Sequence, residues 1–158
     1  NIIITEHGPM GGDEINLISQ EQLNHYGWPY FAYGYDYDYK EKFRLSHTGK
    51  YVKPVFYFSP SIGISEIIYY KKKIFKNWHN KLLVTSLKAK SLFLLDWDNN
   101  NLRVLSYEKI YIGHRIRDIA EIPNGKIFII TDDQKLIILE PNKVKPSIRN
   151  VEKIGVEK

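Results

Sequence analysis

The stretch that decides the fold is Asn80-Lys81-Leu82-Leu83-Val84, followed after a short loop by Ser91-Leu92-Phe93-Leu94-Leu95. A second copy of this pattern reads Gly125-Lys126-Ile127-Phe128-Ile129 and then Lys135-Leu136-Ile137-Ile138-Leu139. The two copies lie about 45 residues apart, which is the length of one blade of a β-propeller. At that period the chain holds about three blades, whereas a closed propeller needs about four to eight. The sequence therefore predicts part of a propeller, with its other blades upstream.

The rest of the chain also has the pattern of strands. Short runs of β-branched and aromatic residues are separated by turn signals such as Asn99-Asn100-Asn101 and Pro123-Asn124-Gly125. The sequence shows no comparable amphipathic helix. The predicted fold class is therefore all-β, with strands at residues 2–4, 55–58, 66–70, 81–85, 91–97, 102–107, 116–122, 126–131 and 135–139.

The composition excludes several classes of protein. Of the 158 residues, 43% are hydrophobic and 14% aromatic, which is enough apolar material for a folded core. The absence of cysteine excludes disulfide scaffolds, thiolate zinc sites, iron–sulfur clusters and cysteine nucleophiles. No apolar run approaches the roughly 20 residues that a membrane span needs. The net charge of +5 is too modest to indicate a nucleic-acid partner, and Lys71-Lys72-Lys73 is more simply a solvated turn.

A Gly- and Pro-rich turn near the start of the chain is followed by two carboxylates. The stretch reads Glu6-His7-Gly8-Pro9-Met10-Gly11-Gly12-Asp13-Glu14-Ile15-Asn16. Such a turn exposes backbone carbonyls, and carbonyl and carboxylate oxygens are the ligands that Ca²⁺ prefers. The alternative is an acidic turn that is only solvated. His7 is a ligand contact on the first interpretation and a capping or packing residue on the second.

Cationic side chains form a second candidate group. Arg115 and Arg117 flank Ile116, so on a strand both guanidiniums lie on one face while Ile116 enters the core. The pair could clamp a carboxylate-bearing ligand, or one Arg could only form an ion pair with the neighbouring Asp118. Lys88 lies in the loop between two strands of the first copy. It either faces solvent or converges with the Arg pair on the central face of a propeller.

The segment 26–39 is rich in aromatic rings. It begins Tyr26-Gly27-Trp28-Pro29-Tyr30-Phe31 and continues with tyrosines that alternate with Gly34, Asp36 and Asp38. One interpretation is a structured surface loop whose rings pack on the face of the propeller. The other is an aromatic wall that binds a sugar or a planar cofactor, because flat rings stack on the apolar faces of both.

Taken together, these segments resemble the soluble quinoprotein sugar dehydrogenases, that is, the glucose/sorbosone dehydrogenase family and especially its aldose sugar dehydrogenase branch. Besides the Gly/Pro turn and Tyr26-Gly27-Trp28-Pro29, the resemblance includes Ser59-Pro60-Ser61-Ile62, Trp78-His79-Asn80 with the strand after it, and Arg115-Ile116-Arg117-Asp118. These stretches occur in the family's order. The resemblance covers residues 1–140, read as C-terminal blades, and leaves residues 141–158 as a C-terminal tail.

The resemblance implies a six-bladed β-propeller that binds pyrroloquinoline quinone (PQQ) through Ca²⁺ and oxidises the C1 hydroxyl of aldose sugars to lactones. It implies that the carbonyl oxygens of Gly8 and Pro9 hold the cofactor calcium. Glu14 and the Tyr26 carbonyl match a second, structural calcium site of some relatives. The cofactor contacts that it implies are His7, Ser61, Lys88, Arg115 and Arg117.

The resemblance also implies that part of the active site lies elsewhere. The general-base His of the family is expected upstream, so no catalytic residue is assigned in this chain, and the chain by itself is expected to be inactive. The expected partners are an aldose sugar and a quinone or cytochrome electron acceptor. The expected location is periplasmic or secreted. The alternative function is a propeller of the same family that serves as a non-catalytic binding or interaction module.

Overall fold

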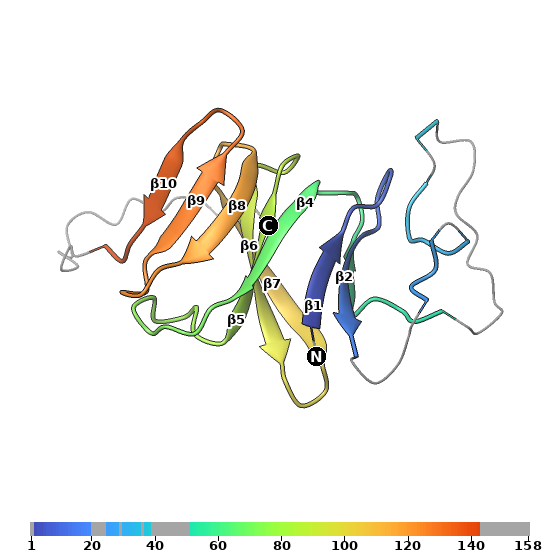
Figure 1. The fold of residues 1–158 in the computed structure, drawn as a ribbon, viewed down its shortest axis with the longest axis horizontal. Coiled ribbons are helices and arrows are strands. Elements are labelled where there is room, and N and C mark those ends of the chain that lie inside the picture. Colours follow the sequence, from blue (N-terminus) through green and yellow to red (C-terminus); the bar gives the residue numbers. More distant parts are fainter. Residues whose placement is uncertain (1, 20–24, 29, 36, 39–50, 143–158) are drawn as a thin grey trace, which may run out of the picture.

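The computed structural model describes residues 2–19, 25–28, 30–35, 37–38 and 51–142, and within them all regular structure is strand. These residues include no helix, and hence none long and apolar enough to cross a membrane. The strands form three antiparallel sheets (Figure 1), which confirms the all-β prediction. Residues 143–158 of the expected tail lie outside the described residues, so that part of the prediction is untested.

Each sheet follows the chain order of its strands. The first contains β1 (Ile2–Glu6), β2 (Asp13–Ile18) and β3 (Phe56–Phe58). The second contains β4 (Ile64–Tyr69), β5 (Lys81–Ser86), β6 (Ser91–Asp98) and β7 (Arg103–Tyr111). The third contains β8 (Ile116–Glu121), β9 (Ile127–Thr131) and β10 (Leu136–Leu139).

One strand of the structure was not predicted from the sequence, and another is longer than predicted. The sequence did not predict β2, because Asp13, Glu14 and Asn16 are polar although all three are buried. Strand β7 continues to Tyr111, beyond the predicted end at 107, because it stays paired with β6 as far as Ser91. Most of the residues in β7 are exposed, so they do not show the alternation by which a half-buried strand is recognised.

The sheets are arranged like the blades of a propeller. Strand β1 contacts β4 and β4 contacts β8, and each of these strands lies at the edge of its own sheet. The Ser65 hydroxyl on β4 donates a hydrogen bond of 2.8 Å to the Ile116 carbonyl on β8. The first strand of each sheet therefore lies beside the first strand of the next, as inner strands do around a propeller axis.

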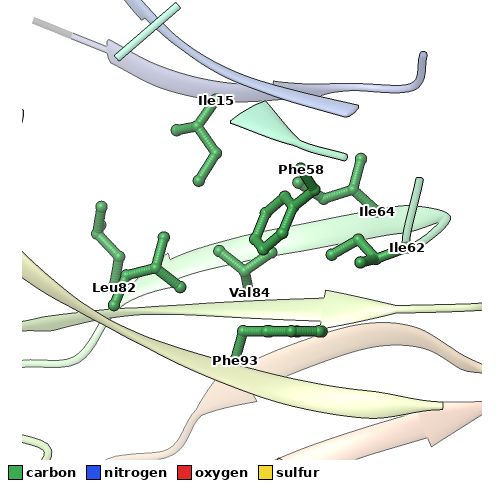
Figure 2. Close-up of a cluster of buried hydrophobic side chains, with 8 residues drawn as sticks. Ile15, Phe58, Ile62, Ile64, Leu82, Val84 and Phe93 are labelled. Atoms are coloured by element: carbon green, nitrogen blue, oxygen red, sulfur yellow. The ribbon is translucent and has the colours of Figure 1, made fainter. Parts of the chain in front are cut away.

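Two clusters of buried hydrophobic side chains join the sheets. The first lies between the β1–β3 and β4–β7 sheets and includes Ile15, Phe58, Val84 and Phe93 (Figure 2). The second lies on the other face of the β4–β7 sheet, against β8 and β9: Tyr70, Leu83, Leu92, Leu94, Ile116, Ile119, Ile127 and Ile129. Because β5 and β6 are covered on both faces, they read in the sequence as unbroken apolar runs.

The turns that follow β1, β3, β5, β7 and β9 lie at one end of the strands, at the top of Figure 1. We call this end the loop face; it consists of residues 7–12, 59–63, 87–90, 112–115 and 132–135. Backbone hydrogen bonds tie neighbouring turns together. The Lys88 amide donates to the Ile62 carbonyl (3.0 Å), and the Asp132 amide donates to the Arg115 carbonyl (2.8 Å).

Candidate functional site

The loop face carries most of the residues that the sequence predicts for the site, distributed over three neighbouring hollows. The first, of about 480 Å³, is lined by five of these residues: His7, Gly8, Pro9, Glu14 and Tyr26. The second, of about 520 Å³, is lined by Ser61 and Lys88. The third, of about 280 Å³, is lined by Arg115. Arg117 follows on β8, where it shares a carboxylate with Arg115.

The Gly/Pro turn has a shape that depends on its three glycines, and Gly11 has a φ of +98°. A Cβ atom on Gly8 would lie 2.0 Å from the Gly11 carbonyl oxygen. Gly12 has a φ of +72°, and a Cβ atom there would lie 2.8 Å from the Gly34 nitrogen. Paired hydrogen bonds between Met10 and Tyr35, of 3.1 and 3.2 Å, hold the turn against the aromatic segment. The backbone of residues 8–12 is therefore packed closely from both sides.

Two carboxylates face each other beside this turn. Glu6 lies opposite Glu14 in the β1–β2 pairing, and the Asn16 amide nitrogen donates to both, at 3.1 Å to Glu14. Burial raises the pKa of Glu14; the Asn16 hydrogen bond lowers it, and the Glu6 charge raises it further. The Asn16 Oδ1 atom is buried without a hydrogen-bond partner among the described residues. This concentration of oxygen atoms and negative charge is suited to a cation.

Side chains alone do not complete such a site. Among the described residues, no three His, Asp or Glu side chains are grouped so that they could hold a metal ion. A cation in the first hollow would take part of its ligand set from backbone carbonyls, as Ca²⁺ does readily. The Tyr26 side chain is used elsewhere, since its hydroxyl donates to the Leu17 carbonyl (2.9 Å).

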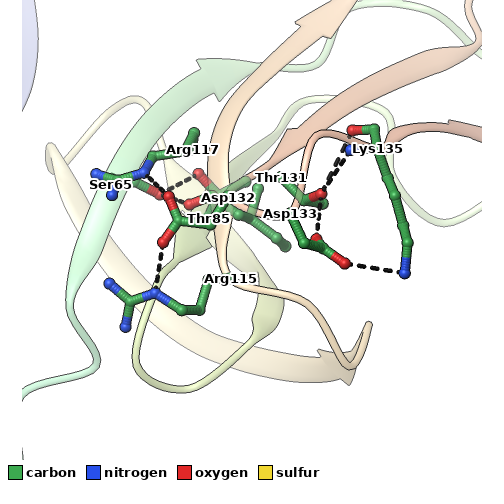
Figure 3. A network of polar contacts seen from close by, with 9 residues as sticks. Ser65, Thr85, Arg115, Arg117, Thr131, Asp132, Asp133 and Lys135 are labelled. Carbon is green, nitrogen blue, oxygen red and sulfur yellow. Dashed lines mark hydrogen bonds and ion pairs between the residues drawn. The ribbon is translucent and has the colours of Figure 1, made fainter.

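The Arg pair is organised by a residue whose role the sequence did not predict. The Nε atoms of Arg115 and Arg117 bind the two carboxylate oxygens of Asp132, at 2.6 Å for Arg115 (Figure 3). The suggested partner, Asp118, was wrong: its carboxylate instead accepts the Ile119 amide. The β9–β10 turn brings Asp132 next to β8, a proximity that sequence spacing does not show.

This arrangement leaves part of each guanidinium available. Figure 3 shows the terminal nitrogens of Arg115 and Arg117 projecting away from Asp132 on the same side. The hydrogen bonds from Arg117 and Arg115 hold the pKa of Asp132 below its usual value, so the carboxylate stays ionised. Paired Nη groups match the geometry of a carboxylate, so the two arginines remain able to bind one while Asp132 holds their Nε atoms.

A second polar cluster lies beside the Arg pair. The Asp133 carboxylate binds His114 Nδ1 at 3.0 Å and Lys135 Nζ at 2.9 Å, and it accepts the Thr131 hydroxyl. The Thr131 hydrogen bond, followed by that of Lys135, holds the pKa of Asp133 well below its usual range. His114 also lines the third hollow. This cluster could not be predicted from the sequence, because the fold of the β9–β10 turn brings Asp133 to His114, 19 residues earlier in the chain.

Lys88 lies on the loop face and forms no ion pair with a carboxylate of the described residues. Its side chain is exposed. Ser61 is less available, because its hydroxyl donates to Asp13 (2.7 Å) and accepts the Gly63 amide (3.2 Å).

Within the aromatic segment 26–39, some rings are packed as in a surface loop and others line a hollow. Phe31 is buried and Tyr33 stacks on Tyr57 with ring centroids 4.0 Å apart, as a packed surface loop requires. Trp28 and Tyr37, which are 62% and 73% exposed, line the first hollow with His7. Pro29, Asp36 and Tyr39 of the same segment lie outside the described residues.

Comparison with known proteins gives a consistent result. The model of the Glucose / Sorbosone dehydrogenase family matches residues 1–140. The chain is 34% identical over 152 residues to aldose sugar dehydrogenase YliI of Escherichia coli, a match that covers 90% of the chain and 38% of the relative. A crystal structure of glucose dehydrogenase superimposes with a TM-score of 0.74 at 28% identity, covering 89% of the chain and 40% of that structure. The soluble aldose sugar dehydrogenase of Escherichia coli in its apo form gives 0.73 at 28% identity, with 86% and 40% covered. The chain thus spans less than half the length of each of these relatives.

Proposed function

The chain belongs to the glucose/sorbosone dehydrogenase family, and from this membership we propose that it forms part of a PQQ- and Ca²⁺-dependent aldose dehydrogenase. The observation that carries the proposal is the charge pattern of the loop face. A hollow suited to a cation, Lys88 and Arg115 lie on turns that hydrogen bonds connect, and Arg117 follows on β8.

The first hollow fits a calcium ion on its own chemistry. Glu6 and Glu14 would repel each other as two anions with one amide between them, and a cation relieves that repulsion. The buried Asn16 Oδ1 atom also lacks a hydrogen-bond donor among the described residues. We propose that the carbonyls of Gly8 and Pro9 bind the calcium of the cofactor. Glu14 and the Tyr26 carbonyl belong to the second calcium site.

The basic side chains fit the cofactor, which is a tricarboxylate. Lys88, Arg115 and Arg117 would bind its carboxylates and quinone oxygens, with His7 and Ser61 at its border. Bound PQQ supplies a quinone that accepts a hydride from C1 of the sugar. The guanidiniums would place positive charge where negative charge develops, and that charge is fixed before the reaction because Asp132 orients both side chains.

Proton removal from the sugar hydroxyl is left to another part of the protein. We propose that residues 1–140 form C-terminal blades, with 141–158 as a tail, and that an upstream blade supplies the general-base His. The proposed product is a lactone, and the electrons pass to a quinone or cytochrome in the periplasm or outside the cell. A non-catalytic propeller is the alternative, but it has no evident need for three basic side chains at and beside the loop face.

The test is sugar-dependent dye reduction by the complete protein, supplied with PQQ and Ca²⁺ and then with each withheld. PQQ binding is followed in parallel by its absorbance, since this readout does not require turnover. Activity that requires both additions supports the dehydrogenase. Binding of neither cofactor by folded protein, together with no activity on several aldoses, would favour the binding module.

A further inference from the structure

We propose that Asp13 is a positioning residue that fixes the Gly8–Pro9 turn for calcium and couples it to the Lys88 loop. The inference rests on the proposed function, because it concerns the residues assigned there to calcium and PQQ. Asp13 itself was assigned no role beyond following the turn. It is distinguished by complete burial of a carboxylate, with an exposed fraction of 0%.

The Asp13 carboxylate accepts four hydrogen bonds from three segments of the chain. Its Oδ1 atom accepts the Gly8 amide at 2.9 Å and the Ser61 hydroxyl at 2.7 Å. Its Oδ2 atom accepts the amides of Ile62 and Ile64 at 2.9 and 3.0 Å. An ionised carboxylate has the acceptor sites for all four donors. Buried charges are tolerated when they are hydrogen-bonded in this way, so the arrangement satisfies Asp13 and orders its donors.

The bond to Gly8 limits the orientation of the proposed calcium ligands. It fixes the peptide between His7 and Gly8, and the ring of Pro9 restricts the next φ angle. The Gly8 carbonyl lies between these two constraints. Because carbonyl ligands must converge on the cation, a turn held in one conformation binds it without first losing conformational entropy.

The bonds to the 59–63 loop extend the same constraint to Lys88. The Ile62 carbonyl accepts the amides of Lys88 and Ala89, each at 3.0 Å, while the Ile62 amide binds Asp13. Gly63 packs against the same loop, since a Cβ atom there would lie 2.9 Å from the Lys88 nitrogen. One carboxylate therefore sets the relative position of the calcium turn and a cofactor-binding cation.

The experiment compares Asp13→Asn with Leu94→Ala in the complete protein. Asn keeps the size of Asp13 but replaces one acceptor oxygen by an NH₂ group, which faces donors. Leu94→Ala opens a cavity in the buried cluster beside β8 and β9 and is distant from the carboxylate, so it reports the effect of lost stability alone. Each variant is titrated with Ca²⁺ at saturating PQQ, with PQQ absorbance as the readout and thermal unfolding as the stability control.

We expect Asp13→Asn to raise the half-saturating Ca²⁺ concentration at least about tenfold. Leu94→Ala should stay within about twofold of the unsubstituted protein at temperatures where it is folded. Equal midpoints in the two variants would overturn the inference. Absence of Ca²⁺-dependent PQQ binding in the unsubstituted protein would instead overturn the proposed function.

A milder variant keeps the test decisive if Asp13→Asn does not fold. Ser61→Ala removes one of the four donors and leaves the carboxylate in place. We expect its Ca²⁺ midpoint at saturating PQQ to rise by about threefold, since a single hydrogen bond is lost. An unchanged midpoint in this variant would count against the positioning role.

Discussion

Among single residues, Glu14 shows most directly how burial gives a side chain its chemistry. It is 7% exposed and lies opposite Glu6, so desolvation and then the neighbouring charge raise its pKa, against the lowering effect of the Asn16 hydrogen bond. The folded protein therefore holds this proton at a pH where the unfolded chain has released it. Stability consequently falls as pH rises from the ordinary pKa of a Glu through the raised value, unless a cation is bound.

Glu14→Gln should stabilise the metal-free protein at pH 7, because it removes the buried charge and keeps the shape of the side chain. We expect the midpoint of thermal unfolding to rise by about 2–4 °C at pH 7 and by much less at pH 4. Added Ca²⁺ should stabilise the unsubstituted protein more than the variant. The control is Glu108→Gln on an exposed stretch of β7. A lower midpoint for Glu14→Gln at pH 7 would contradict this account.

At the level of elements, the start of β8 carries the Arg pair, and the β9–β10 turn supplies the carboxylate that orients it. Arg117→Lys removes the bidentate face of one guanidinium, while Arg115 still binds Asp132. We expect PQQ affinity to fall about 10–100-fold, with little change in the free energy of unfolding because the pair is exposed. Titration by PQQ absorbance measures the first effect and denaturant unfolding the second.

The matched control is Arg103→Lys, since Arg103 forms another exposed pair, with Asp98 at 3.6 Å, near the turn between β6 and β7. It should leave PQQ affinity unchanged. Unchanged affinity in Arg117→Lys as well would mean that the arginine only forms an ion pair with Asp132.

The elements also show where sequence reasoning succeeds and where it stops. The β5 and β6 runs were predictable because burial on both faces leaves continuous apolar segments. Strand β2 was not predictable, because it buries polar residues such as Asp13. The hydrogen-bond donors that make this burial possible come from residues far along the chain. For the same reason the sequence identified Arg115 and Arg117 as a pair but not Asp132, which reaches them through the β9–β10 turn.

At the scale of the whole molecule, the candidate site takes residues from each of the three described sheets. The Gly/Pro turn at residues 8–12 belongs to the first sheet, Lys88 to the second and the Arg pair to the third. Their relative positions depend on the two clusters between the sheets, the first of which is drawn in Figure 2. The repeat predicted the blades, but a repeat alone does not show which side chains of different blades meet. Packing between the sheets should therefore hold the three sheets together and contribute to stability.

Phe58→Ala tests that dependence. Phe58 is buried between the first two sheets, contacts Phe93 with ring centroids 5.2 Å apart, and directly precedes the 59–63 loop. We expect a loss of about 3–5 kcal/mol in the free energy of unfolding, measured by denaturant titration. The control is Tyr57→Ala on the opposite face of β3, where stacking on Tyr33 accounts for about 0.5–1.5 kcal/mol. Because the middle sheet shares both clusters, the described sheets should still unfold in one transition. Equal losses from the two variants, or separate transitions, would show that the sheets are not held together through this core.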